Sequence, residues 1–194
     1  MMQNRVYWMM GGSGSGKSTA AEVMREMGVF VIDADEVSHG VLLKGGSAYG
    51  EVLNFFGKSF LKNDGEIDRR ALGKEVFSDE GKLLKLNEIT HKHIKAEILR
   101  LCEGKEVVLI DAPLPPTEFM EVYHLLYILA PYKVRIKRIA ERDGISEEYA
   151  ALRLENQKEI DEYIVNADTI IENDGDVQKF KAKIKNWCEY EKII

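Results

Sequence analysis

Residues 11–19, Gly-Gly-Ser-Gly-Ser-Gly-Lys-Ser-Thr, constrain this chain more than any other stretch. They contain the phosphate-binding pattern Gly-x-x-x-x-Gly-Lys-Ser, directly after the apolar run 6–10 and directly before a helix-like segment. Glycines let backbone N–H groups approach a phosphate, and the next helix points its positively polarised N-terminus at the same anion. The pattern and its context therefore predict a nucleoside triphosphate site instead of a flexible turn.

Two side chains of this loop are expected to act on the triphosphate. Lys17 brings a full positive charge to the β- and γ-phosphates, and the Ser18 hydroxyl is the expected ligand of Mg²⁺. The residues of the loop that are expected to bind the nucleotide are Gly12, Ser13, Gly14, Ser15, Gly16, Lys17, Ser18 and Thr19.

The composition limits what else the chain can be. With 194 residues, 45% of them hydrophobic, it can bury the core of one domain, and its net charge of −6 argues against nucleic acid or an acidic membrane as a partner. Cys102 and Cys188 are too isolated for a disulfide framework or a zinc site. The chain enters its first strand without a leader and has no apolar run of membrane-spanning length, so a cytoplasmic location is expected. The sequence leaves protein partners open.

Short apolar runs alternate with helix-like segments, which is typical of α/β proteins. The runs 29–32, 107–110 and 125–130 are continuously apolar, as parallel strands buried on both faces are. Asp111 ends the predicted strand 107–111, and a further strand is predicted at 168–172. Residues 37–67 interrupt the alternation with helices and polar turns. The spacing of apolar residues then predicts helices over 79–101 and 177–190, and Ser146 can cap a helix that runs through Arg153 and Gln157.

Acidic residues end two of the predicted strands. Asp33 and Asp35 follow the run 29–32, and the carboxyl ends of parallel strands line the ligand crevice, so both are expected beside the phosphate loop. Asp33 could instead cap a helix that starts at residue 34. Asp111 ends the run 107–111, where it could hold a magnesium-bound water or cap the turn into Pro113.

A basic segment stands out in this acidic chain. Lys133, Arg135, Lys137, Arg138 and Arg142 fall within ten residues, and the three arginines share one face of a helix. The three arginines suggest a mobile lid that brings cations to the transferring phosphates, and a solvated helix face is the alternative.

The segment between the second and third strands offers further candidates. Arg69 and Arg70 begin a helix and could contact phosphate or solvent alone. His91 and His93 are two residues apart on a helix, so they face different sides and cannot chelate one metal ion.

Taken in order, these motifs resemble those of the dephospho-coenzyme A kinase family over almost the whole chain. The residues that carry the resemblance are Gly-Gly-x-Gly-Ser-Gly-Lys-Ser-Thr at 11–19, Ile-Asp-Ala-Asp at 32–35, Gly-Glu-Ile-Asp-Arg-Arg-Ala-Leu at 65–72, Val-Phe at 76–77, Leu-Asn at 86–87, Ile-Thr-His at 89–91, Asp-x-Pro-Leu at 111–114, Arg138 to Arg142, Arg-x-x-x-Gln at 153–157, Ala-Asp at 167–168 and Asn-x-Gly at 173–175.

The resemblance implies ATP-dependent phosphorylation of the ribose 3′-hydroxyl of dephospho-coenzyme A, which completes coenzyme A. It also implies an α/β, three-layer P-loop kinase fold like that of nucleoside monophosphate kinases, with a five-stranded parallel sheet, a helical substrate subdomain and a lid. We expect one domain over 1–194, with a substrate-binding insertion at about 37–104 and the lid at about 132–166. ATP, dephospho-coenzyme A and Mg²⁺ are the implied ligands.

The resemblance also implies roles for individual residues. Asp33 becomes the general base, and Lys17 and Arg142 act on the phosphates. The set expected to contact the acceptor is Asp35, Arg69, His91, Pro113 and Leu114. The set that extends the nucleotide site is Arg138, Asn173 and Gly175, of which the last two border the adenine.

The chain departs from the family pattern on the acceptor and lid side, at Lys92, at 115–118 and at 163–165. Another small acceptor, such as a nucleoside monophosphate, is therefore an alternative. A non-catalytic nucleotide-binding regulator is a second alternative. A GTPase is disfavoured because the chain has no Asn-Lys-x-Asp element for guanine.

Overall fold

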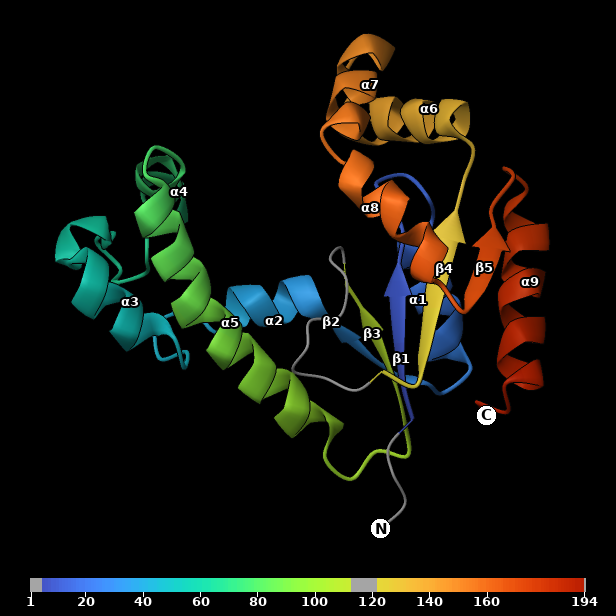
Figure 1. The fold of residues 1–194 in the computed structure, drawn as a ribbon, viewed down its shortest axis with the longest axis horizontal. Helices are drawn as coiled ribbons and strands as arrows, with labels where there is room; N and C mark the ends of the chain where they lie inside the picture. Colours follow the sequence, from blue (N-terminus) through green and yellow to red (C-terminus); the bar gives the residue numbers. More distant parts are fainter. Residues whose placement is uncertain (1–4, 113–121, 194) are drawn as a thin grey trace. The chain divides into compact units, whose positions relative to one another are not determined.

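The computed structural model describes residues 5–112 and 122–193. The chain divides into two compact units. The first combines Met1–Asp33 with Gly104–Ile194, and the second is Ala34–Glu103. Figure 1 shows the elements of both, and each unit is described by itself below.

A parallel sheet forms the centre of the first unit (Figure 1). Its strands are β1 (Arg5–Met10), β2 (Phe30–Asp33), β3 (Val107–Asp111), β4 (His124–Leu129) and β5 (Thr169–Glu172). Within the described residues the sheet has five strands in the order β2-β3-β1-β4-β5, and every neighbouring pair is parallel. The prediction of a five-stranded parallel α/β sheet is therefore confirmed.

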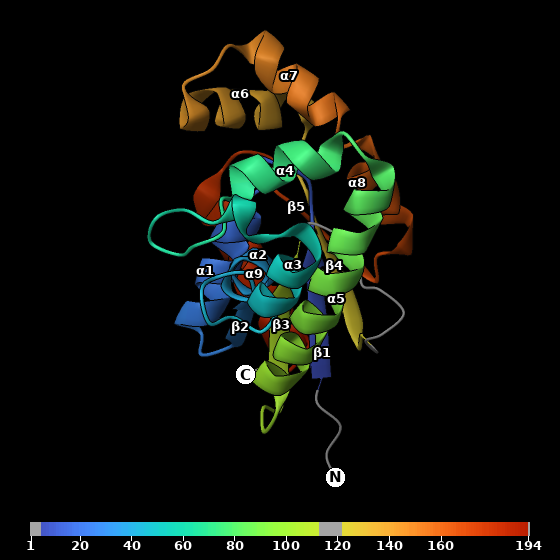
Figure 2. The ribbon, with the colours of Figure 1, turned by 90° about the vertical axis from the view of Figure 1, so that its left-hand side faces the viewer.

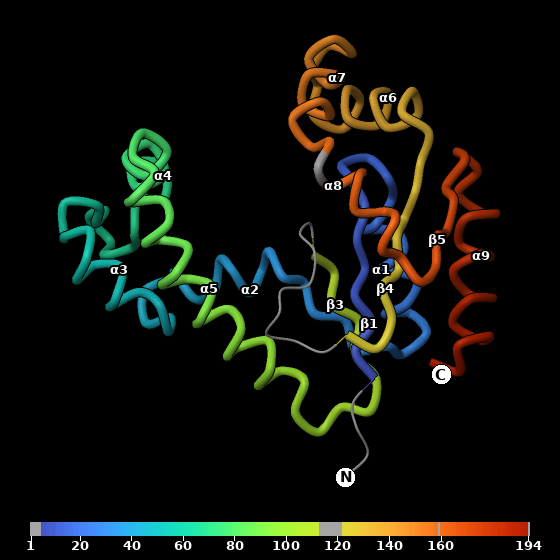
Figure 3. Tube along the Cα trace, in the orientation of Figure 1, coloured from blue at the N-terminus to red at the C-terminus, as the bar shows by residue number. Residues whose placement is uncertain are grey.

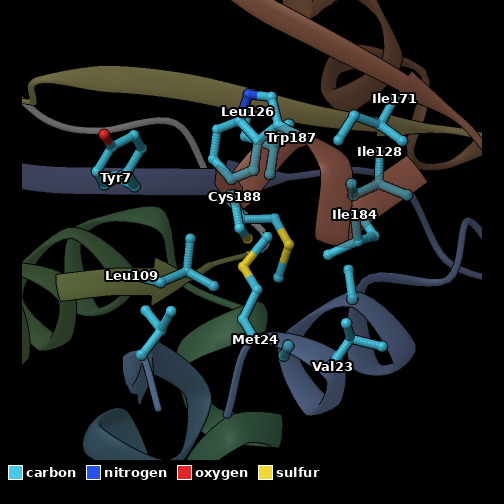
Figure 4. Close-up of a cluster of buried hydrophobic side chains, with 14 of the residues drawn as sticks. Tyr7, Val23, Met24, Leu109, Leu126, Ile128, Ile171, Ile184, Trp187 and Cys188 are labelled. Carbon is cyan, nitrogen blue, oxygen red and sulfur yellow. The ribbon is translucent and has the colours of Figure 1, made fainter. Parts of the chain in front are cut away.

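One face of this sheet is covered by α1 (Lys17–Glu26) and α9 (Val177–Tyr190), which contact each other. Figure 4 shows Met24 of α1 and Ile184, Trp187 and Cys188 of α9 with side chains of the strands in one apolar cluster. Side chains of β1 that point to the other face of the sheet, such as Trp8, are also buried. Burial on both faces explains the unbroken apolar runs of the sequence.

Three helices follow β4: α6 (Tyr132–Asp143), α7 (Glu147–Glu155) and α8 (Lys158–Glu162). Figure 2 shows α6 and α7 side by side, joined by an apolar cluster around Ile139 and Leu154. After α8 the chain returns through η2 (Tyr163–Asn166) to β5 (Figure 3). The prediction of one helix from Ser146 to Gln157 is wrong at its end, because α7 stops at Glu155 and Gln157 precedes α8.

The second unit is helical. It contains α2 (Ala34–Gly40), α3 (Tyr49–Phe56), η1 (Lys58–Phe60), α4 (Arg69–Phe77) and α5 (Glu80–Cys102). Side chains of α3, α4 and α5, including Val52, Leu72 and Ile89, form a core of its own. Among the described residues of the whole chain, no helix combines the length and the apolar character needed to cross a bilayer.

Candidate active site

The phosphate loop links β1 to α1, and three of its glycines, Gly11, Gly14 and Gly16, have positive φ values. Gly14 has a φ of 76° and Gly16 a φ of 106°, values that disfavour residues with a Cβ. The Ser15 N–H closes a tight turn by donating to the Gly12 carbonyl at 3.1 Å. No described side chain caps α1 at Gly16, so the first amides of this helix stay available to an anion.

Lys17 lies against a carboxylate at the end of a neighbouring strand. Its Nζ is 3.1 Å from Asp111 Oδ1, and the two side chains are 20% and 11% exposed. Asp111 ends β3, beside β1, and pairs in register with Asp33, the last residue of β2. Because neighbouring strands are about 4.8 Å apart, Lys17, Asp111 and Asp33 form one group at the carboxyl end of the sheet.

The environment of Asp111 disfavours its charged form. Burial raises the pKa of its carboxyl group, the nearby Lys17 ammonium opposes this effect, and the negative charge of Asp33 adds to it. Because the pKa stays above its ordinary value, ionised Asp111 lowers the free energy of unfolding relative to a neutral side chain of the same shape. The position of Asp111 is therefore unfavourable for stability.

Replacing Asp111 with Asn should stabilise the ligand-free protein. We expect D111N to raise Tm at pH 7 in EDTA by about 2–4 °C, the shift that 1 kcal/mol produces in a protein of this size. The gain should shrink as the pH falls towards about 4, where the Asp111 carboxyl becomes protonated in the folded and the unfolded state. Thermal unfolding of both proteins across this pH range tests the expectation, and a lower Tm for D111N at pH 7 contradicts it.

The donor atoms at this place suit a hard divalent cation. Ser18 follows Lys17 at the exposed start of α1, and Asp111 brings a carboxylate to the same group. Within the described residues, Asp111 Oδ1 is buried without a hydrogen bond of good geometry. Mg²⁺ prefers oxygen donors and is usually held by one or two protein groups together with substrate phosphates, so these residues fit it.

Residues from distant parts of the chain hold the phosphate loop from outside. Arg138 donates from Nη1 to the Gly14 carbonyl at 3.1 Å and from Nη2 to Asn173 Oδ1 at 3.0 Å. Asn173, which is 3% exposed, donates from Nδ2 to the Ser15 carbonyl at 2.8 Å. Two of the three residues predicted to extend the nucleotide site thus contact the loop itself, while the third, Gly175, lies before α9 with a φ of 120°.

The three arginines of α6 do not share one environment. Arg135, which was expected on the lid face with the other two, is 4% exposed, donates from Nε to the Ser13 carbonyl at 2.9 Å and pairs with Asp161 at 2.7 Å. Arg142 is 64% exposed and pairs with the adjacent Asp143 at 2.7 Å. Spacing along a helix fixes which face a side chain occupies, but not what packs against that face.

The residues expected to contact the acceptor, apart from 113 and 114, lie in the second unit. Asp35 is in the first turn of α2 and His91 is exposed on α5. Arg69 begins α4 after Asp68, whose carboxylate accepts from two backbone N–H groups and caps the helix. Hydrogen bonds from the Ala71 and Arg70 amides lower the pKa of Asp68. Arg69 also lines a cavity of about 550 Å³ with Arg70, Gly73, Lys74, Phe77 and Ser78.

Lys92 and His93 share a carboxylate on another helix. Lys92 Nζ lies 2.6 Å from Glu51 Oε1 and His93 Nε2 lies 3.0 Å from Glu51 Oε2. The hydrogen bond from Lys92, followed by that from His93, lowers the pKa of Glu51. The departure from the family pattern at Lys92 therefore joins α5 to α3 in this unit.

Pro113, Leu114 and the atypical positions 115–118 lie outside the described residues. Gln157 was missed as a site residue, although its Oε1 accepts from the Ser13 N–H at 3.2 Å. No local pattern in the sequence could reveal this contact, because the two residues are 144 positions apart.

Comparisons with known proteins agree with this geometry. The family model described as dephospho-CoA kinase matches residues 6–179. A dephospho-CoA kinase from Bacillus cereus is 35% identical over 193 residues, which cover 94% of this chain and 96% of that one. Among solved structures, the Thermus thermophilus protein TT1252 has a TM-score of 0.80 at 25% identity, with 97% of this chain and 98% of that one covered. A dephospho-CoA kinase from Campylobacter jejuni has a TM-score of 0.65 at 28% identity, with 96% and 97% covered. The chain belongs to the dephospho-CoA kinase family.

Proposed function

We propose that this chain is an ATP-dependent kinase that phosphorylates the ribose 3′-hydroxyl of dephospho-CoA, releasing CoA and ADP. The observation that carries this proposal within the family is the group of Lys17, Asp111 and Asp33 at the end of the phosphate loop. Transfer of a phosphoryl group to a hydroxyl requires a cation for the phosphates and a second carboxylate near it. Nucleotide binding alone needs no second carboxylate.

The chain's own residues divide the reaction between them. Asp33 orients the 3′-hydroxyl and accepts its proton as the hydroxyl oxygen bonds to the γ-phosphorus and the bond to the β–γ bridging oxygen breaks. Lys17 stabilises the negative charge on the phosphates, and the free amides of α1 do the same from the loop. Ser18 and Asp111 would hold Mg²⁺, which neutralises phosphate charge when it is bound.

The remaining predicted residues complete the proposal. Asp35, Arg69 and His91 bind dephospho-CoA, so Ala34–Glu103 is the acceptor-binding part of the chain. Arg138, Asn173 and Gly175 belong to the nucleotide site, and the segment 132–166 is the lid. A cytoplasmic location, without a nucleic acid or membrane partner, is part of the same proposal.

Arg142 tests the role of the lid. Because its side chain is 64% exposed and its ion pair within the described residues is with the adjacent Asp143, R142A should change Tm little. If Arg142 contacts the phosphates during transfer, the same variant should lower kcat at least about tenfold. Steady-state kinetics and thermal unfolding of R142A are compared with those of K133A, an exposed lysine on the same helix. A lower Tm with an unchanged kcat would return Arg142 to a surface role.

The acceptor is tested with a panel in a coupled assay of ADP release. Dephospho-CoA should stimulate ADP release strongly, and AMP, CMP and shikimate should not. Faster release with any of these three acceptors than with dephospho-CoA would overturn the proposed acceptor. Nucleotide binding without stimulated release by any acceptor would indicate a regulator instead of a kinase.

A further inference from the structure

The guanidinium of Arg135 joins the phosphate loop to α8. Its Nε donates to the Ser13 carbonyl at 2.9 Å, and its Nη1 pairs with Asp161 Oδ2 at 2.7 Å. The Arg135 side chain is 5% exposed and that of Asp161 is 37% exposed. A buried arginine of this kind is stable only if its charge is compensated, so the loop contact depends on Asp161. Figure 3 shows that the trace of α8 passes beside the loop that follows β1.

Gly12 leaves room for the Arg135 guanidinium because it has no side chain. The phosphate-binding pattern leaves position 12 open to other residues. A Cβ built on Gly12 would nevertheless overlap Arg135 Nη2, and it would lie 2.9 Å from Asp161 Oδ1. The glycine at this position is therefore explained by the guanidinium that packs on it.

Three consecutive carbonyls of the loop accept hydrogen bonds from outside it. Ser13 accepts from Arg135, Gly14 from Arg138 and Ser15 from Asn173. In a planar trans peptide the next N–H points away from the carbonyl, so fixing a carbonyl also fixes the direction of the next amide. The amides that follow these carbonyls are those expected to face a phosphate.

Asp161 is in turn held by the sheet. The hydroxyl of Tyr127, a residue of β4 that is 1% exposed, donates to Asp161 Oδ1 at 3.0 Å. A tyrosine hydroxyl is protonated at neutral pH and can donate this hydrogen bond, and burial raises its pKa further. A continuous set of contacts therefore runs from β4 through Asp161 and Arg135 to the Ser13 carbonyl.

We propose that Arg135 and Asp161 are positioning residues that hold the phosphate loop in its nucleotide-binding shape. Neither residue is assigned contact with the reacting atoms. They act through the orientation of the Ser13–Gly14 peptide, and this preorganisation lowers the free energy that nucleotide binding must supply to order the loop. The identity of the nucleotide as ATP rests on the proposed function, and the positioning role does not.

The test is ADP binding to the purified full chain by calorimetry, followed by steady-state kinetics. We expect R135Q to raise the Kd for ADP and the KM for ATP about tenfold or more, while the KM for dephospho-CoA stays within twofold. D161N should shift the same two constants, and the R135Q/D161N double variant should bind ADP no more weakly than R135Q. K137Q removes an exposed charge from the same helix and is the matched control. The G12A substitution should weaken ADP binding in the wild-type background and do so less in R135Q.

Several results would overturn the proposal. One is an ADP Kd for folded R135Q within twofold of wild type, even if its Tm is lower, because Arg135 would then only stabilise the fold. Another is additivity of R135Q and D161N, which would mean that the two residues act independently. If R135Q does not fold, D161N decides by the same criteria. Failure of the wild type to phosphorylate dephospho-CoA would count against the proposed function alone, since ADP binding needs no acceptor.

Discussion

Replacing Asp33 with Asn is expected to lower kcat at least about a hundredfold, the usual scale of a general base, while ATP affinity stays near that of the wild type. Asn keeps the size of the side chain but cannot accept a proton. Asp33 lies beside Asp111 at the end of β2 and is not part of the glycine loop. Its substitution should therefore leave nucleotide binding unchanged.

The measurement is kcat with saturating dephospho-CoA, together with ADP affinity from calorimetry. The matched control is E22Q, which removes a carboxylate from the exposed side of α1. Near-normal turnover of D33N would remove Asp33 from the mechanism and leave it as the last residue of β2, directly before α2, where a capping role is the alternative.

The second large effect is expected for Lys17→Ala. Loss of the charge that meets the phosphates should lower kcat/KM for ATP by about a thousandfold, the upper part of the range for removing one such group. The substitution also leaves the buried Asp111 carboxylate without its ion-pair partner, so Tm should fall, opposite in sign to the effect of D111N.

The double variant K17A/D111N separates these two consequences. It should regain the Tm lost in K17A because no buried charge is left alone, yet its activity should stay as low as that of K17A. K185A, an exposed lysine of α9, is the control for loss of a surface charge. A K17A protein with wild-type activity would contradict the role given to the phosphate loop.

The sequence predicts the sheet well because its signals are local. The runs 107–111 and 177–190 have the bounds of β3 and α9, and the parallel arrangement follows from apolar strands that alternate with helices. The break between α7 and α8 is missed because it depends on a tertiary contact: Gln157 leaves the helix pattern where its side chain accepts from the Ser13 N–H.

The site is predictable only where one short motif contains it. Lys17 and Ser18 follow from the glycine pattern, and Asp33 and Asp111 follow from their position at strand ends. Arg135 and Asp161 could not be found in this way, because a buried arginine and an exposed one look alike in a basic helix. The contacts of Lys92 and His93 with Glu51 are likewise visible only in the folded unit, because Glu51 is about forty residues away in the sequence.

The most direct test of the central claim is analysis of the product formed from dephospho-CoA and ATP. Phosphorus NMR should show one new phosphate monoester on the ribose 3′-oxygen for each ADP released. The reaction should be lost in D33N and kept in E22Q. ADP release without this product, or a phosphate at any other position of dephospho-CoA, would contradict the claim that the group of Lys17, Asp111 and Asp33 transfers phosphate to the 3′-hydroxyl.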